Sequence, residues 1–457
     1  MTTTPSRTPL LSIGFDEKLS PAKTGLFGFQ HLLALTGIWL FPGIIGVSLD
    51  LSAQEVGWIT QGCFFMTGLI TILQSSRILQ LPIVQGPTAA FMVAIIASGA
   101  TFGLGTAFGS MMVAGAIFAL LSLPSRRFGL FGQVSRIASD PLVFGTLFVI
   151  IGGQLAAIGL SGWFGAEGAT GYGWPFFLLS LATVVFVMAF TIFGGNTLLR
   201  RGAIFWGIVA GTALTAVCGL WALPDLSEVA VIGTPQFLPF GFGVEWSVVI
   251  LMLLAFLQGG TESMGMFRLV SSWGNRTVPI ERVNRGLFAE FTGSVAGAAF
   301  GGIGTTSYPE NAGIVRMSGV GSRYVTATAG AVALVLAFIP KVGLFIAGLP
   351  MPVLAAASTV LFGVIAISGI QMLAEVEWDD LNLMVAAPAF IISLGSQFLP
   401  ESIVAAMGPS VESIVTNPMM VGVILLLALH LLINYGIRPL ITARKSRVAR
   451  PLPAEDE

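Results

Sequence analysis

The chain has 457 residues, of which 55% are hydrophobic and only 9% are charged. A soluble globular protein would carry roughly a quarter charged residues, so the composition excludes that class. The net charge of −1 gives no electrostatic support for nucleic-acid binding. Apolar runs of about 20 residues recur along almost the whole length, which predicts an all-α polytopic membrane protein.

In chain order, the apolar runs predict fourteen membrane spans, seven on each side of a polar connection at about 223–245. The first seven lie near 27–47, 54–74, 83–100, 104–123, 137–158, 174–194 and 202–222. The second seven lie near 247–267, 286–303, 305–320, 324–346, 352–372, 383–399 and 418–437. The third, tenth and thirteenth spans are weak as continuous helices.

The placement of charge supports this number of spans. With the N-terminus inside, only Lys341 of the 21 Lys and Arg residues falls outside, whereas acidic residues such as Glu167 collect in the outside loops. Twelve spans would also put both ends inside but would reverse several basic loops. The positive-inside rule therefore predicts fourteen crossings with cytoplasmic tails at 1–26 and 438–457.

Seven spans per half place the two halves in the membrane in opposite orientations, which is typical of transporters with a binding site at the repeat interface. Two polar, proline-containing stretches, Leu81–Phe91 and Thr305–Gly313, occupy the third span of each half. We expect each to form a short extended segment followed by a half-helix. The two helix N-termini would then offer free backbone N–H groups to one central ligand.

Three acidic residues lie within predicted spans: Glu262, Glu290 and Glu310. Burial disfavours the ionised form of a carboxyl group, so such residues can exchange protons or accept hydrogen bonds from ligand N–H groups. Glu262 follows a Gly259–Gly260 pair that would allow close backbone approach. Each acid could instead be a packing residue satisfied by a neighbouring hydroxyl, and Glu290 is as well explained by a place at the cytoplasmic edge of the membrane.

Other features have simpler interpretations. Glycines at four-residue spacing predict helix-packing faces: Gly293, Gly297 and Gly301, and Gly207 and Gly211. His31 is expected to be a hydrogen-bonding structural residue rather than a proton carrier. The two cysteines lie in apolar segments and indicate neither a disulfide nor a metal site.

These residues carry a resemblance to the nucleobase–ascorbate transporter family, also called the second nucleobase:cation symporter family. Its signature is Gln, Glu or Pro, then Asn-x-Gly, four variable residues, Thr, and Arg, Lys or Gly. The matching stretch here begins Glu310-Asn311-Ala312-Gly313, continues through Ile314 to Met317 and ends Ser318-Gly319, with Ser in place of Thr. Gln30-His31, the Glu262 stretch and Pro350-Met351-Pro352-Val353 match as well.

The resemblance implies a seven-plus-seven inverted-repeat fold with short β-strands in spans three and ten. It also implies a core domain at 27–123 and 247–346 that carries substrate past a gate domain at 137–222 and 352–437. The family's members are usually homodimers, and this chain would be one in the inner membrane of a bacterium.

The resemblance further assigns residues to roles. Substrate binding would involve Glu262, Glu310, Asn311, Thr88, Ala89 and Pro309. Glu262 and Glu310 would couple transport to protons, with His31, Ser318 and Met266 in support. No metal or other cofactor is expected, and the coupling ion would be H⁺, with Na⁺ as the alternative.

Several departures bear on the substrate. Met266 stands where some bacterial uracil carriers have a histidine, and Ala89 replaces an aromatic residue that would stack on a base. Pro309 lacks a backbone N–H. Glu at the first signature position resembles uracil carriers, whereas Gly321-Ser322-Arg323-Tyr324 resembles purine-type members.

The sequence thus predicts proton-coupled symport of a nucleobase of the uracil or xanthine class. The main alternative is a carrier of an organic acid or anion on the same inverted-repeat fold, which Arg316 leaves open. An intramembrane enzyme would need a nucleophile–base pair or an acid-rich metal motif, and a channel would need a ring of charge; the sequence predicts neither.

Overall fold

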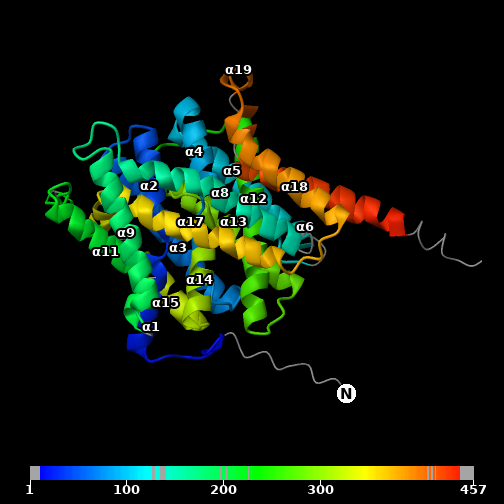
Figure 1. The fold of residues 1–457 in the computed structure, drawn as a ribbon, viewed down its shortest axis with the longest axis horizontal. Coiled ribbons are helices and arrows are strands. Elements are labelled where there is room, and N and C mark those ends of the chain that lie inside the picture. Colours follow the sequence, from blue (N-terminus) through cyan, green and yellow to red (C-terminus); the bar gives the residue numbers. More distant parts are fainter. Residues whose placement is uncertain are drawn as a thin grey trace, which may run out of the picture.

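A computed structural model describes residues 11–442 except 126–128, 134–139, 196, 202, 225, 228, 409–410, 413–414 and 417. Parts of the predicted tails at 1–26 and 438–457, and the start of the 137–222 segment, therefore lie outside the described residues. The described chain is an almost entirely helical bundle (Figure 1).

The elements follow the predicted spans closely. The first half contains α1 (Pro21–Leu33), α2 (Thr36–Ser48), α3 (Ala53–Leu73), η1 (Gln74–Ile78), β1 (Gln85–Pro87), α4 (Ala89–Phe102), α5 (Leu104–Leu121), α6 (Leu130–Gln133), α8 (Pro141–Ser161), η2 (Gly162–Phe164), α9 (Trp174–Phe193), α10 (Leu198–Arg201) and α11 (Ala203–Val217). The second half contains α12 (Trp246–Trp273), α13 (Ile280–Ala299), β2 (Thr305–Ser307), α14 (Pro309–Ser318), α15 (Arg323–Leu336), α16 (Pro340–Ala347), α17 (Met351–Leu373), α18 (Asp380–Gly395), η3 (Ser396–Phe398), α19 (Glu401–Val404), α21 (Pro418–His430) and η4 (Leu431–Ile437).

Two predicted spans are interrupted. The apolar run at 27–47 is not one helix but two, α1 and α2, with Leu35 at the junction in a non-helical conformation. The run at 324–346 is likewise divided into α15 and α16, because Pro340 favours a helix start and disfavours helical geometry in the residue before it. Hydropathy alone does not detect these breaks, since both junctions remain apolar.

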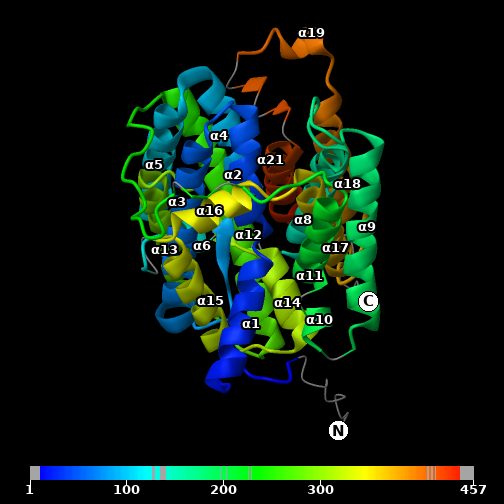
Figure 2. The same ribbon diagram turned by 90° about the vertical axis from the view of Figure 1, so that its left-hand side faces the viewer.

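Among the described residues, eight helices are long and apolar enough to cross a membrane. Three shorter apolar helices of 10–17 residues accompany them: α4, α11 and α15. Figure 2 shows α3, α5, α13 and α15 on one side of the molecule and α9, α17 and α18 on the other. The chain thus folds as two helical groups, and α12 lies between them in this view.

Small residues allow close helix contacts within both groups. In the first, an added Cβ on Gly68 of α3 would lie 2.6 Å from Leu334 N and 2.7 Å from Gly330 O in α15. In the second, α8 and α17 run side by side (Figure 1), and a Cβ on Gly369 would lie 2.6 Å from Gly145 O. These contacts bring helix backbones together, as expected of helices that pack in lipid.

The predicted glycine faces are largely confirmed. Gly293 and Gly297 of α13 pack against Ile70 and Met66 of α3. Gly207 and Gly211 of α11 pack against Val187 and Thr183 of α9. Gly301 is an exception to its predicted series: it follows the end of α13 with φ +71°, a left-handed conformation in which glycine is favoured.

The N-terminal residues are not a free tail as far as they are described. Leu11 and Phe15 are buried, and Ile13 forms a parallel β-bridge with Val320. Within the predicted tail at 1–26, alternating apolar side chains therefore pack against the helical body.

We expect Gly68→Ala to lower the thermal stability of the purified protein, because its new Cβ would overlap backbone atoms of α15. Overpacking of this kind costs about 1–3 kcal/mol. Gly363→Ala in α17 is the matched control, since nothing lies within 4 Å of a Cβ at that position. A thermal unfolding curve of each variant in detergent would contradict the packing if Gly68→Ala were at least as stable as Gly363→Ala.

Candidate functional site

Two strand-to-helix junctions meet inside the bundle. Strands β1 and β2 pair antiparallel, with Gln85 opposite Ser307 and Pro87 opposite Thr305. Thr88 N donates to Gly304 O at 3.1 Å, which extends the pairing at one end. Helices α4 and α14 begin directly after the two strands, so their N-termini leave the strand pair at opposite ends. The first turn of each helix carries N–H groups with no partner inside the helix.

A buried polar network holds the strand pair in place. Gln85 Nε2 lies 3.0 Å from Glu290 Oε2 and 2.9 Å from Ser307 Oγ. Ser263 Oγ donates to Glu290 Oε2 at 2.6 Å and accepts from Ser307 N at 2.9 Å. Side chains from α12 and α13 are thereby joined to both strands. Because these groups have no access to water, each bond satisfies a group that would otherwise be costly to bury.

The contacts of Glu290 match the interpretation of a packing residue satisfied by a neighbouring hydroxyl. Its side chain is fully buried on α13 and belongs to the network around Gln85 and Ser263. Sequence reasoning identified Glu290 as an intramembrane acid but missed these two partners. Gln85 had one detectable signal, an amide within an otherwise apolar extended stretch.

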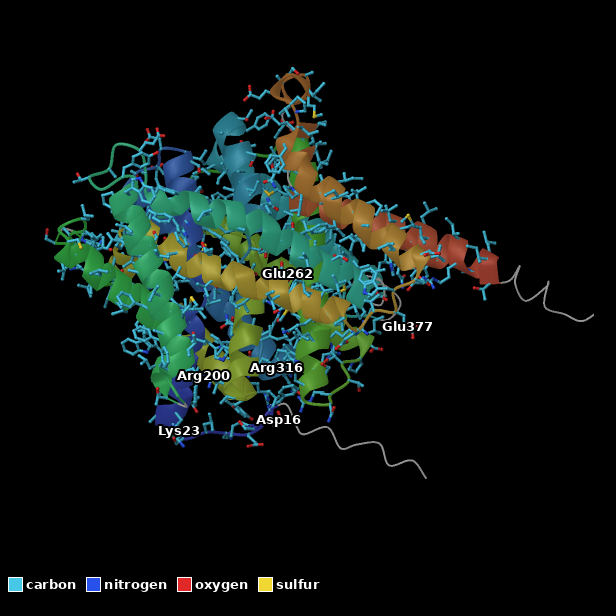
Figure 3. All side chains as sticks on the ribbon, viewed as in Figure 1. Asp16, Lys23, Arg200, Glu262, Arg316 and Glu377 are labelled. Carbon is cyan, nitrogen blue, oxygen red and sulfur yellow. The ribbon has the colours of Figure 1, made fainter. Side chains whose placement is uncertain are left out.

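Glu262 and Glu310 lie close to this network. Glu262 precedes Ser263 on α12, and Glu310 is in the first turn of α14. Both side chains are buried, and Glu262 interacts electrostatically with Glu310 and Glu290. Glu310 Oε2 and Glu290 Oε1 are buried without a hydrogen-bond partner among the described residues. In Figure 3, Glu262 lies near the middle of the molecule.

The two glycines before Glu262 differ in how closely other residues pack against them. Gly260 permits close packing, because an added Cβ would lie 2.7 Å from the Phe131 ring and 2.8 Å from the Phe291 ring. Gly259 has room for a Cβ at ordinary contact distance, and its carbonyl accepts from Thr306 Oγ1 at 3.0 Å. The expected close approach therefore applies to Gly260 alone.

His31 connects α1 to the signature stretch. Its Nδ1 lies 2.8 Å from Asn311 Oδ1, so His31 has the hydrogen-bonding role that the sequence predicted. Asn311 Nδ2 is buried without a partner among the described residues, as are both amide atoms of Gln30. Buried polar atoms normally have partners, so this group of donors and acceptors indicates a place for a polar ligand or water.

The remaining predicted site residues divide by position. Thr88 and Ala89 are buried at the start of α4, and Pro309 is half-buried at the first position of α14. Met266 is buried one turn beyond Glu262 on α12. These residues lie on the same elements as the strand junctions and the acidic residues.

Ser318 and Arg316 lie apart from this group. Ser318 ends α14, where its hydroxyl accepts from Val320 N at 3.2 Å. Arg316 is exposed, with its guanidinium 5.8 Å from the centre of the Trp273 ring. Figure 3 shows Arg316 toward the end of the molecule at which Asp16 lies, away from Glu262.

We expect Gln85→Ala to lower thermal stability, because it leaves the buried Glu290 carboxylate and Ser307 hydroxyl without their amide partner. Each unsatisfied buried group costs about 1–3 kcal/mol. Gln397→Ala in η3 is the matched control, since among the described residues that exposed amide donates only to Leu394 O at the end of α18. Equal melting temperatures for the two variants would show that the network does not stabilise the strand pair.

Proteins named as uric acid or xanthine permeases align with most of the chain. The uric acid permease PucK of Bacillus subtilis (strain 168) is 28% identical over 414 residues, covering 89% of this chain and 94% of the relative. The uric acid transporter UacT of Escherichia coli (strain K12) is 29% identical, covering 84% and 80%. The xanthine permease XanP of the same organism is 28% identical, covering 81% and 85%.

Two solved structures share the fold. The transmembrane domain of the cyanobacterial bicarbonate transporter BicA has a TM-score of 0.57 at 17% identity, covering 92% of this chain and all of that one. The murine anion transporter Slc26a9, in its inward-facing state, has a TM-score of 0.61 at 13% identity, covering 92% and 69%. At this identity the likeness concerns the fold alone.

A family model described as the permease family (Xan_ur_permease) matches residues 22–402. That range includes α1, both strand junctions and all of the buried acidic residues described above. The protein is therefore a permease and not an enzyme, and the chain belongs to the nucleobase–ascorbate transporter family.

Proposed function

We propose that this protein is a proton-coupled symporter that imports a nucleobase across the bacterial inner membrane. The observation that carries the proposal is the set of buried polar atoms without a partner among the described residues, on Glu310 and Asn311 at the start of α14 and on Gln30, next to His31 on α1. Relatives named as uric acid and xanthine permeases favour a purine of the xanthine type over uracil.

The chemistry of these groups suits a flat, polar, neutral ring. Glu262 and Glu310 would accept hydrogen bonds from ring N–H groups, and the Asn311 and Gln30 amides would donate to ring carbonyls. The segment at Thr88 and Ala89, with the N-terminus of α4, would add backbone donors. Pro309 contributes shape only, because it has no N–H.

A buried carboxyl group near other acids can carry the coupled proton. Glu262 is our first choice, because it is buried and interacts electrostatically with both Glu310 and Glu290. Protonation of one member relieves repulsion among the three, which links proton uptake to the charge state of the site. Sodium remains the alternative coupling ion, and no metal or other cofactor is required.

The transport step would be an elevator movement of one helical group past the other. In this proposal the core comprises 27–123 and 247–346, and the gate comprises 137–222 and 352–437. Fourteen crossings as inverted repeats, with both ends cytoplasmic, would place the strand pair near the membrane centre. In a homodimer, contact between the two gate domains would hold them fixed while the core domains move.

Transport of an organic acid or anion on the same fold is the competing hypothesis. Bicarbonate and anion transporters share this architecture, but fold likeness does not transfer a substrate. An anion site would need either a nearby cation or half-helix N-termini without facing carboxylates. Arg316 is exposed over Trp273. Two acidic residues beside the ligand position also disfavour an anion.

We expect Glu310→Gln to weaken nucleobase binding by about 10- to 100-fold, the effect of losing one charge-assisted hydrogen bond. Ligand-induced shifts in melting temperature should be measured with xanthine, uric acid, hypoxanthine, uracil, thymine, ascorbate and bicarbonate. Glu401→Gln on exposed α19 is the matched control. If bicarbonate alone stabilises the wild type, the nucleobase assignment is wrong.

We expect Glu262→Gln to abolish proton-driven accumulation while base exchange across the membrane continues at a reduced rate, because a glutamine cannot release a proton. Uptake of labelled base and pH change inside proteoliposomes would be followed together. Glu245→Gln, at the start of the same helix, is the control. Continued proton influx with Glu262→Gln would exclude Glu262 as the carrier, and sodium-driven uptake by the wild type would exclude proton coupling.

A further inference from the structure

The residues Leu11–Leu19 form a strap across the end of the molecule at which α1 begins. Its backbone pairs with the link between α14 and α15: Ser12 N and Ile13 N donate to Gly319 O at 2.8 and 3.0 Å. Gly321 N donates back to Ile13 O at 2.9 Å. We call this segment the N-terminal strap.

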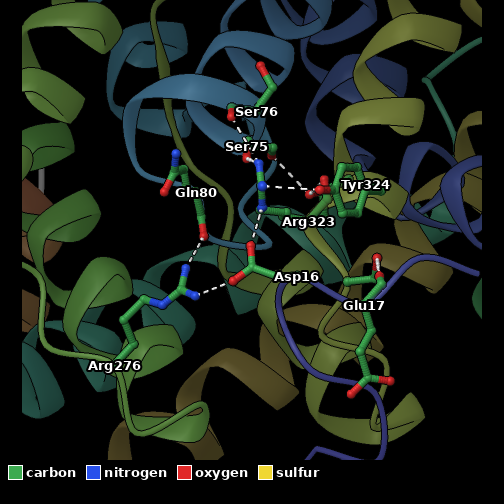
Figure 4. Close-up of polar contacts among 10 residues, drawn as sticks. Asp16, Glu17, Ser75, Ser76, Gln80, Arg276, Arg323 and Tyr324 are labelled. Carbon is green, nitrogen blue, oxygen red and sulfur yellow. Dashed lines mark hydrogen bonds and ion pairs between the residues drawn. The ribbon is translucent and has the colours of Figure 1, made fainter.

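Asp16 joins the strap to two arginines on different links of the chain (Figure 4). Arg323 Nε donates to Asp16 Oδ1 at 2.6 Å, and Arg276 donates to the other carboxylate oxygen. The arginines in turn hold backbone carbonyls near the end of α3. Arg323 Nη1 donates to Ser76 O at 2.9 Å, and Arg276 Nη1 donates to Gln80 O at 3.0 Å.

Apolar packing seats the strap beneath these ion pairs. The Arg276 guanidinium lies 5.3 Å from the centre of the buried Phe15 ring. A Cβ on Gly274 would lie 2.4 Å from the same ring, so the link after α12 is shaped to receive it. Leu11 is also buried. The strap therefore contacts the links that follow α12 and α14 directly, and it is connected to the segment after α3 through the two arginines.

Helix α14 is thereby held at both ends. Its first turn carries Glu310 and Asn311 and follows the strand pair, whereas its far end is Gly319, whose carbonyl accepts from two strap N–H groups and from Ser12 Oγ at 3.0 Å. The two ends are about 14 Å apart along the helix axis. A short helix of this kind moves as a unit, so loosening its far end would displace its first turn.

We propose that Asp16 is a positioning residue for the substrate site, acting through the strap to fix α14 and hence Glu310 and Asn311. This inference rests on the proposed function, because it takes those two residues to contact the nucleobase. It assigns no contact between Asp16 and the ligand.

The two guanidiniums, Arg276 and then Arg323, hold the pKa of Asp16 below its usual range. A carboxyl group with a lowered folded-state pKa stabilises the fold above its unfolded pKa of about 3.9, and that contribution is lost as pH falls through the lowered value. The ion pairs of Asp16 should therefore persist across pH 5–8. The effect of removing Asp16 on substrate binding should be constant in that range.

The test compares Asp16→Asn, Asp16→Glu and the matched control Glu17→Gln in the full chain. Among the described residues, the Glu17 side chain accepts from Gly14 N within the strap, at 2.9 Å, and from neither arginine, so its substitution removes the same charge and leaves both ion pairs in place. The first readout is the KM and maximal rate of nucleobase uptake at pH 5–8. The second is amide hydrogen exchange of residues 309–318 in the ligand-free protein, which does not depend on the identity of the substrate.

For Asp16→Asn we expect KM to rise about three- to tenfold at unchanged maximal rate, a size set by partly exposed ion pairs. Exchange in α14 should quicken while exchange in α8 and α17 stays as in the wild type. Asp16→Glu should restore most of the wild-type KM, and Glu17→Gln should match the wild type throughout.

Three results would overturn the inference. Quickened exchange throughout the protein would make the strap a general stabiliser, and unchanged exchange in α14 would remove the positioning role. Because the exchange measurement needs no ligand, failure of the nucleobase assignment would leave it interpretable. A nucleobase that binds the wild type while Asp16→Asn leaves KM unchanged would disprove the positioning role alone.

Discussion

The pairing of β1 with β2 is the constraint on which the site depends. Extended backbone inside an apolar bundle exposes N–H and C=O groups that water cannot reach, so each must find a partner in protein. The antiparallel ladder satisfies some of them, and hydroxyls of Thr71, Ser263 and Ser294 receive backbone N–H groups of the strands. Without these partners the two half-helices could not begin where they do.

The same region divides its polar groups into satisfied and unsatisfied sets. Behind the strands, Gln85 and Ser263 bind one oxygen of Glu290, and the network fixes α12 and α13 relative to the ladder. At the start of α14, Glu310 Oε2 and Asn311 Nδ2 have no partner among the described residues. A hydrogen-bonded network that supports unpartnered polar atoms at the start of a half-helix is the arrangement expected of a preorganised binding site.

The fold itself does not identify the substrate. Transporters of bicarbonate and other anions share the architecture at 17% and 13% identity, whereas purine permeases align at 27–29% over most of the chain. The substrate argument rests on the charged and polar groups near the strands of this chain. Two acidic residues and two amides suit a ring with N–H and C=O groups, and the exposed position of Arg316 removes the cation that an anion would require.

The sequence by itself determined the membrane class and nearly all helix positions. It also located the two extended segments that precede half-helices, Leu81–Phe91 and Thr305–Gly313, because hydropathy and proline placement are local properties. It also singled out Glu262, Glu290 and Glu310, since acidic residues in apolar runs stand out. Only the tertiary structure decided that Glu290 is a network residue bound to Gln85, that Ser318 lies at the far end of α14, and that Asp16 bridges Arg276 and Arg323. Those contacts join residues as many as 307 positions apart, and no local pattern records which distant side chains a fold brings together.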